Sequence, residues 1–343
     1  MLATALGLSL GWEGLLLLGA PPEVLPGAWS YLAIVSGSFV LASLTFVGNA
    51  ALRGAGDTRT PLLIMLLVNG INILFTWLLV GGHWGLPALG VAGSAWGAAI
   101  GRGVGGVVVL LLLLRGRSGL RLALMRLDSL MVRRLLRVGL PAAGEQLIFR
   151  FGMLTFNAMI ASLGTVAYAA HTIGIQAESL SWLPGFGFGI AATTLVGQAL
   201  GAGDPRQAQR SGYVAYAIGA SFMSSLGILL VLFPAFFIGV FTDDADVIQA
   251  GTLPLQIMGL AQPVLASTMI FNGGLRGAGD TRWVLLANAG GVWVVRLPLT
   301  YALIHYAGWG LAGVWTAMAI DQAVRGSLAF LRFKSGRWKH ISV

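Results

Sequence analysis

The 343-residue chain lacks cysteine and carries little charge. Without cysteine there is no disulfide, no zinc–thiolate centre and no thiol nucleophile. Charged residues make up 10% of the chain, whereas about 25% is usual in soluble domains, and 57% of the residues are hydrophobic. Acidic residues are especially scarce, with 12 Asp and Glu against 21 Lys and Arg. This composition predicts that most of the chain lies in lipid.

Ten hydrophobic segments divide the sequence, and most reach the roughly 20 residues that an α-helix needs to span a bilayer. No strand-like alternation of apolar and polar residues accompanies them, so the segments predict an all-α polytopic membrane protein rather than a barrel. Several are long enough to require tilting or bending, and Pro184 predicts a break or bend inside the longest of them. The segments are 1–18, 29–52, 60–82, 88–114, 136–162, 165–200, 208–240, 248–275, 283–305 and 309–331.

Among the connections between these segments, only alternate ones contain Lys and Arg. They occur at Arg53 and Arg59, across 115–137, at Arg206 and Arg210, at Arg276 and Arg282, and in the tail from Arg332 to Lys339. The intervening connections contain no Lys or Arg, and two of them carry the acidic residues Glu23, Asp243, Asp244 and Asp246. Because positive charge marks the cytoplasmic side, we expect the basic connections and the C-terminus in the cytoplasm of a plasma (inner) membrane. The partner of the positive charge is then the lipid bilayer, which argues against nucleic acid.

An eight-residue string, LRGAGDTR, occurs at 52–59 and again at 275–282. Both copies fall on the same predicted side, so an even number of spans separates them. This indicates a six-helix unit repeated in parallel. We therefore expect an incomplete N-terminal lobe of four spans (1–114), a basic cytoplasmic linker (115–135), a complete six-span lobe (136–331) and a basic tail (332–343). The same register predicts a truncated twelve-helix protein lacking roughly 90 N-terminal residues.

Each repeated string has the residues of a helix–helix connection. Gly54 and Gly56, like Gly277 and Gly279, permit the positive φ that ends a helix. Asp57 and Asp280 then stand where a carboxylate caps the next helix. Arg53 and Arg276 can reach helix carbonyl groups or lipid phosphate. A purely structural connection is one interpretation, and a cytoplasmic contact that locks two helices together is the other.

These features resemble the multidrug and toxic compound extrusion (MATE) family. The resemblance rests on RGAGDT at 53–58 and 276–281, on GLPAAGEQL at 139–147 and on the segment 169–204. It implies two six-helix lobes that alternate between inward-open and outward-open states. It also implies export of drugs, such as small amphipathic or cationic compounds, in exchange for Na⁺ or H⁺. No cofactor beyond the coupling ion and no partner subunit are expected.

Charged residues inside the spans are candidates for ion coupling, because each is costly in lipid. Glu145 corresponds to an acid that some members of the family use for cations, so Na⁺ near it is one alternative. An ion pair with Arg150 is another. His171 and Glu178 are two turns apart on one helix face, which suits either a proton path or an interhelical hydrogen bond. Arg296 is expected to neutralise a carboxylate in the cavity.

Two further pairs and one asparagine concern the same spans. Asp321 and Arg325 have the i, i+4 spacing of a helical ion pair. Trp182 and Phe186 can stack on an aromatic cation or simply pack. Asn272 is expected to bridge two helices.

Other functions remain in competition with an exporter. A flippase of lipid-linked precursors, from the same superfamily, would have a more basic cavity. A non-functional fragment is a second alternative, since part of the first lobe is expected to be missing. A membrane enzyme is disfavoured, because no metal-ligand spacing or nucleophile motif occurs. Segment 248–275 contains no acid, and this leaves Na⁺ and H⁺ both open as the coupling ion.

Overall fold

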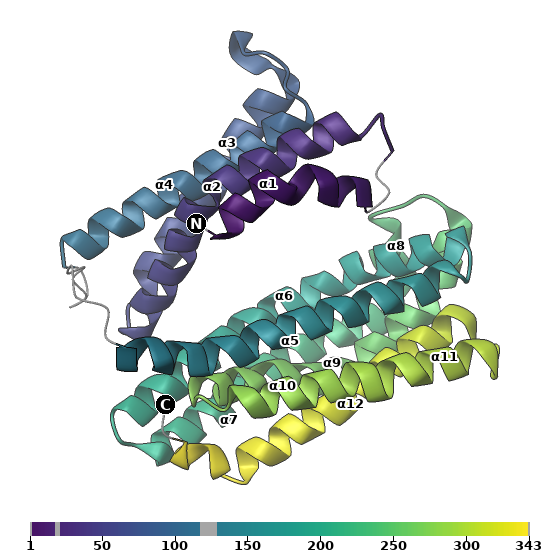
Figure 1. Cartoon of the computed structure of the whole chain (residues 1–343). Coiled ribbons are helices and arrows are strands. Elements are labelled where there is room, and N and C mark those ends of the chain that lie inside the picture. The colour runs from purple at the N-terminus through teal and green to yellow at the C-terminus, as the bar shows by residue number, and fades with distance from the viewer. Residues whose placement is uncertain (1, 18–20, 117–128, 342–343) are drawn as a thin grey trace. The chain divides into compact units, whose positions relative to one another are not determined.

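The computed structural model describes residues 2–17, 21–116 and 129–341, and every regular element in these ranges is a helix. The predicted all-α class is therefore confirmed for the described chain. The helices form two compact units, residues 1–126 and 127–343 (Figure 1). Most of the predicted linker, at 117–128, lies outside the described residues.

The first unit consists of four long helices. They are α1 (Leu2–Leu17), α2 (Leu25–Gly54), α3 (Arg59–Gly81) and α4 (Val91–Leu114), with a short turn η1 (His83–Gly85) after α3. Helix α4 packs against both α2 and α3. Gly106 permits the close approach of α4 to α2, because a Cβ there would lie 2.6 Å from the carbonyl oxygen of Leu41. Small residues are the usual means of bringing membrane helices together.

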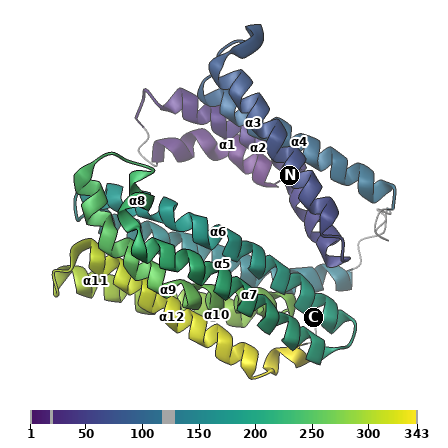
Figure 2. The ribbon, with the colours of Figure 1, turned by 180° about the vertical axis from the view of Figure 1, so that it is seen from behind.

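The second unit is built around α9, which packs against α6, α7 and α12 (Figure 2). Its elements in chain order are α5 (Ser129–Ala161), α6 (Thr165–Gly201), α7 (Pro205–Leu232), α8 (Pro234–Gly239), α9 (Ala245–Gly277), α10 (Thr281–Gly290), a π-helical segment η3 (Gly291–Arg296), α11 (Leu297–His305), α12 (Gly310–Lys334) and the turn η4 (Arg337–His340). Its largest buried side chains include Trp315, Phe156 and Phe271.

The helix bounds differ from the hydrophobic segments in three places. Helix α5 begins at Ser129, inside the predicted linker. The prediction missed its first turns because they contain basic residues, which lower the mean hydropathy. Helix α6 runs unbroken through Pro184, where a break was expected. The segment predicted at 283–305 is divided into α10, the π-helical η3 and α11.

Seven stretches of the described chain are long and apolar enough to cross a membrane, by length and composition. They are α2, α3, α4, α6, α7, α9 and the run from α10 through α11. The other three expected spans are the helices α1, α5 and α12. This agrees with the prediction of a polytopic membrane protein.

Candidate functional site

The second unit encloses a cavity of ≈ 570 Å³. Residues from α5, α6, α9, α10, η3 and α12 line it, and most of the wall is apolar, with Phe149, Met153, Trp182 and Phe186 among the larger side chains. The charged residues that line it are Glu145, Glu178, Arg276, Arg296 and Arg325. A concave apolar site with a few convergent polar groups is typical of small-molecule binding.

Glu145, from α5, is buried and held by two partners. Its Oε1 accepts hydrogen bonds from Arg276 Nη2 at 2.5 Å and from Asn288 Nδ2 at 2.6 Å. Asn288 in turn accepts a bond from Asn272 Nδ2 at 3.3 Å, which confirms that Asn272 bridges two helices. The alternative of an ion pair with Arg150 is wrong, because Arg150 is exposed and Arg276 supplies the guanidinium.

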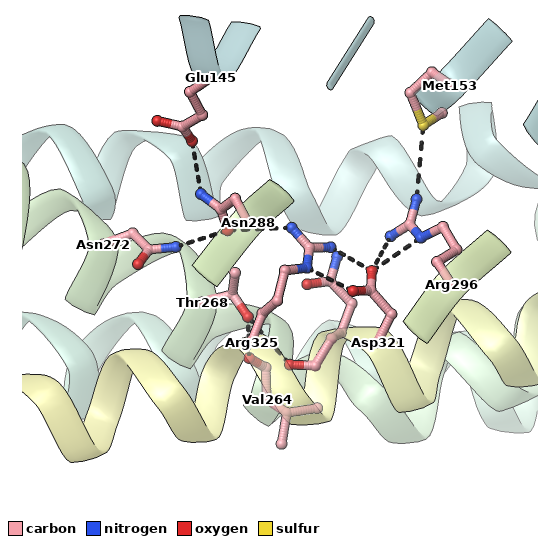
Figure 3. A network of polar contacts seen from close by, with 10 residues as sticks. Glu145, Met153, Val264, Thr268, Asn272, Asn288, Arg296, Asp321 and Arg325 are labelled. Atoms are coloured by element: carbon pink, nitrogen blue, oxygen red, sulfur yellow. Dashed lines mark hydrogen bonds and ion pairs between the residues drawn. The ribbon is translucent and has the colours of Figure 1, made fainter. Parts of the chain in front are cut away.

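A second charged cluster lies further along the cavity (Figure 3). Asp321, fully buried on α12, accepts bonds from Arg296 Nε at 2.9 Å and from Arg325 Nη2 at 2.6 Å, both at Oδ2. Arg325 Nε binds the other oxygen at 2.8 Å, so the predicted i, i+4 ion pair is confirmed. One carboxylate shared by two guanidinium groups leaves this cluster with a net charge of one positive unit. Buried charges require such pairing.

Arg296 Nη2 also lies 2.8 Å from Asp321 Oδ2, whereas the other terminal nitrogen, Nη1, makes only a weak contact. Arg296 Nη1 lies 3.7 Å from the thioether sulfur of Met153 on α5. The same guanidinium carbon lies 5.4 Å from the ring centroid of Phe156, within the range of a cation–π contact. Arg296 thus connects η3 to both α12 and α5.

Glu178 and His171 share a face of α6 but occupy different surroundings. Glu178 is 3% exposed and lines the cavity. None of the ion pairs among the described residues includes it; Gln262 of α9 is its side-chain hydrogen-bond partner, and Arg296 is the charged side chain that acts on it electrostatically. His171 is not among the residues that line the cavity. Its Nδ1 accepts a bond from Trp315 Nε1 at 3.1 Å, and its ring packs against Phe156 and Trp315.

The charges of the cavity balance in a particular way. Glu145 and Arg276 cancel, and the single excess positive charge of the Asp321 cluster is balanced by Glu178 when that carboxyl group is ionised. Protonation of Glu178 leaves the cavity with one net positive charge. Trp182 and Phe186, whose ring centroids are 6.2 Å apart, stand on the same helix face near Glu178. The arrangement can accept an apolar or aromatic molecule beside one titratable group.

The repeated strings form two similar turns with different side-chain partners. Gly56 (φ 93°) and Gly279 (φ 80°) have the predicted positive φ. Gly54 and Gly277 do not, because they are the last residues of α2 and α9. The expectation of positive φ was therefore right for the second glycine of each string and wrong for the first.

The predicted capping role holds for one aspartate and fails for the other. Asp57 Oδ1 accepts from the backbone N–H of Thr60 at 2.9 Å, at the start of α3. Asp280 makes no such bond to α10 and instead accepts from Arg332 Nε at 2.7 Å. Arg332, from α12, also lies 5.1 Å from the ring of Trp283. Both kinds of bond are charge-assisted on the carboxylate side, but the guanidinium of Arg332 also carries a full positive charge, so Asp280 binds α12.

Three functional features escaped the sequence pattern. The pairing of Glu145 with Arg276 spans 131 positions, and no local spacing signals it. Asn288 is a polar residue in an apolar segment, which was a usable signal. The only sequence signals for the π-helical η3 are the adjacent glycines Gly290 and Gly291 and the proline that follows it, Pro298.

Comparison with known proteins gives consistent matches. The chain matches the MatE family over residues 2–78 and 141–302. It is 36% identical over 325 residues to the "Probable multidrug resistance protein NorM" of Thermotoga maritima, covering 94% of this chain and 69% of that one. It is 32% identical over 335 residues to the "Multidrug resistance protein NorM" of Burkholderia vietnamiensis, covering 95% and 72%. It also resembles a structure described as the outward-facing conformation of a multidrug resistance MATE family transporter, with a TM-score of 0.90 at 22% identity, over 97% of this chain and 74% of that one.

Proposed function

This chain belongs to the MatE family of membrane transporters, and from that premise we propose that it is a secondary-active antiporter that exports organic cations and other amphipathic drugs in exchange for H⁺ or Na⁺ by alternating access. The observation that carries the proposal is the ≈ 570 Å³ cavity of the second unit, which is apolar except for a few charged groups. Amphipathic compounds need such a wall, because burial of their apolar surface supplies most of the binding free energy.

Glu178 is the group to which we assign the exchange of ions. It is a buried carboxyl group in the cavity wall, none of the ion pairs of the described chain includes it, and its hydrogen-bond partner Gln262 is uncharged. A cation, whether the substrate or the coupling ion, has a direct electrostatic reason to bind there. Trp182, four residues along α6, offers an aromatic face to the same molecule.

We favour H⁺ over Na⁺ as the coupling ion. A sodium ion beside Glu145 would compete with Arg276, which already lies 2.5 Å from that carboxylate. Na⁺ needs oxygen ligands around it, whereas the two side chains that contact Glu145 Oε1, Arg276 and Asn288, both present N–H groups to it. A proton needs only one carboxyl group.

The remaining candidate residues then have supporting roles. Glu145 ties α5 to α9 and α10 through Arg276 and Asn288. His171 fastens α6 to α12 through Trp315. Arg296 supplies the charge that faces Glu178. In this scheme the substrate binds when Glu178 is ionised and leaves when a proton replaces it.

A flippase for lipid-linked precursors remains the second candidate, since three arginines line the cavity. Their pairing with Glu145 and Asp321 weakens it, because only one positive charge is left over and Glu178 balances that one. We also propose that the chain acts as a monomer in the plasma (inner) membrane with its C-terminus in the cytoplasm, on the strength of its basic connections.

The proposal is tested with the 343-residue chain in proteoliposomes loaded with ethidium. We expect efflux when a pH gradient is imposed and none with a Na⁺ gradient alone. Glu178→Gln should abolish the response to the pH gradient, and Glu178→Asp, which keeps the titratable group, should retain part of it. Equal pH-driven efflux by wild type and Glu178→Gln would remove Glu178 from the mechanism. Efflux driven only by Na⁺ would reverse the choice of ion, and no efflux with either gradient would contradict the exporter.

A further inference from the structure

The helix that carries Arg296 has a defect that its counterpart in the first unit lacks. In the second unit this helix contains the π-helical segment η3 (Gly291–Arg296) between α10 and α11, whereas α3 is one uninterrupted α-helix from Arg59 to Gly81. Both begin within the last two residues of LRGAGDTR, so their residues can be matched position by position. π-Helical turns are rare and are often found at functional sites.

Comparison of the two helices shows that η3 inserts one extra residue between two successive residues of the face that packs inward. Val68 and Asn72 lie on the face of α3 that packs on α4, where a Cβ at Gly105 or Gly101 would meet them. Gly291 and Arg296 occupy the corresponding face toward α12, where a Cβ at Gly291 would overlap the side chain of Arg325. The spacing is four residues in α3 and five across η3.

The residues beyond the defect keep the new register. Thr76 follows Asn72 by four positions, and Thr300, fully buried, follows Arg296 by four. Within this helix the offset between the repeats is therefore 223 residues up to Gly291 and 224 from Arg296 to Thr300. In an uninterrupted α-helix Arg296 would occupy the place of Ile73, turned about 100° from that face, and Ile73 is 71% exposed.

We propose that η3 is a positioning device that brings Arg296 to the cavity wall. There the permanent positive charge of Arg296 offsets the negative charge of Glu178 and so limits the affinity of the cavity for cations. Arg296 and Glu178 both line the cavity, and Arg296 alone among its charged side chains has a nitrogen whose partner in the described chain is a thioether. The charge keeps Glu178 from holding a cation too tightly to release it. This role rests on the proposed function of the cavity.

Gly291 and Pro298 are the residues that make the segment possible. At Gly291 a side chain would collide with the Arg325 methylenes and with Asp321 Oδ1, so only glycine allows the ion pair of α12 to lie against the backbone here. Pro298, near the start of α11, has no N–H to donate to the carbonyl of Val294. The lost α-helical bond falls inside η3 and favours the wider turn.

The first test separates the position of Arg296 from its charge. Exchange of two neighbours, Val295→Arg with Arg296→Val, places the guanidinium where a regular helix would point it inward. We expect the exchanged protein to lose the Asp321 ion pair and to melt several degrees below wild type, as Arg296→Gln does. Deletion of Val294, which is 73% exposed, should give a regular helix with Arg296 four residues after Gly291 and a melting temperature near that of wild type. A swap that melts like wild type, or a deletion that melts like Arg296→Gln, overturns the positioning role.

The second test measures ethidium binding to the same purified variants by fluorescence. Arg296→Gln removes the positive charge from the cavity wall, and the exchange moves it to position 295, so both should bind ethidium about tenfold more tightly than wild type. Arg296→Lys keeps the charge and should bind ethidium like wild type, even though lysine cannot reproduce the contact that Arg296 makes with Asp321 through both Nε and Nη2. Equal affinity of Arg296→Gln and wild type, or equal changes in Gln and Lys variants, would overturn the charge role. Absence of binding by wild type contradicts the proposed function and this charge role together, while the melting series still decides the position.

Discussion

The two copies of LRGAGDTR have the same backbone and different surroundings. In the first, the N–H groups of Gly56 and Asp57 donate to the carbonyls of Arg53 and Leu52 at 3.0 Å. In the second, Gly279 and Asp280 donate to Arg276 and Leu275 at 3.0 and 2.9 Å. The side chains diverge, since Asp57 binds the start of α3 whereas Asp280 binds Arg332 of α12. Eight identical residues thus encode one turn but not one set of partners.

The comparison separates local from tertiary determinants. The turn depends on glycine at the position with positive φ and on helix-ending hydrogen bonds, which are properties of the string itself. The partners depend on the helices that lie nearby, which are properties of each unit. Substitution of equivalent residues in the two copies should therefore change the free energy of unfolding equally where the effect is on the turn backbone. It should change it unequally where the effect is on contacts with neighbouring helices.

The largest difference is expected at the first glycine of each string. A Cβ at Gly277 would overlap the backbone of Thr193 on α6, whereas one at Gly54 meets no atom within 4 Å. Gly277→Ala should destabilise the second unit by about 3 kcal/mol through overpacking. Gly54→Ala should be neutral or stabilising by about 0.5 kcal/mol, since alanine is the better helix former. Denaturant unfolding in detergent, with hydrogen exchange to identify the unit, measures both, and equal costs would refute the contrast.

Loss of the Arg276 guanidinium should have the next largest effect. Arg276→Gln leaves Glu145 buried with Asn288 as its remaining partner. Breaking a buried pair costs about 3–5 kcal/mol, and because Arg276 is 37% exposed we expect about 2 kcal/mol. Glu145→Gln combined with Arg276→Gln should recover part of the loss, because no buried charge is then left alone. A double variant less stable than both single variants would contradict the ion pair as the cause.

The two aspartates should differ more modestly. Asp280→Asn removes the charge that Arg332 contacts and should cost about 1.5 kcal/mol. Asp57→Asn keeps one oxygen that can cap α3, and asparagine caps helices about as well as aspartate, but it weakens the bond that Oδ2 accepts from the Thr60 hydroxyl at 2.6 Å, so a smaller cost of about 0.5–1 kcal/mol is expected. Unfolding of the paired variants under identical conditions gives the comparison. If Asp57→Asn proves the more costly, the assignment of partners is wrong.

The smallest difference is expected at the second glycine. Gly56→Ala and Gly279→Ala each force a side chain into a left-handed backbone, at a cost of about 1 kcal/mol. Because φ is 93° at one and 80° at the other, the two losses of stability should agree within experimental error. A clear inequality would show that the turns are not equivalent after all.

Much of the fold could be predicted from the sequence, because it depends on composition and period. The apolar segments, the repeat and the helix-ending glycines are local signals, and the helices lie close to where these place them. The main errors have local causes too. Basic residues hid the first turns of α5, and a proline inside α6 suggested a break that neighbouring helices do not require.

The candidate site was only partly predictable. The spacing of Asp321 and Arg325 predicted their ion pair, because four residues make one helical turn. The same reasoning put His171 and Glu178 on one face, yet Trp315 takes His171 away from the cavity. Pairings such as Glu145 with Arg276 join distant helices, and no periodicity within one helix reveals them.

The sequence by itself determined that this is a helical membrane protein of the MatE family with a repeated turn, because hydropathy, helical period and glycine geometry are local properties. Only the tertiary structure decided which carboxyl group faces the cavity with no partner in the described ion pairs and which are neutralised. The physical reason is that a buried charge is defined by what packs against it. Even the inward orientation of Arg296 depends on one π-helical segment packed against α12, and the sequence of that segment does not predict a π-helix.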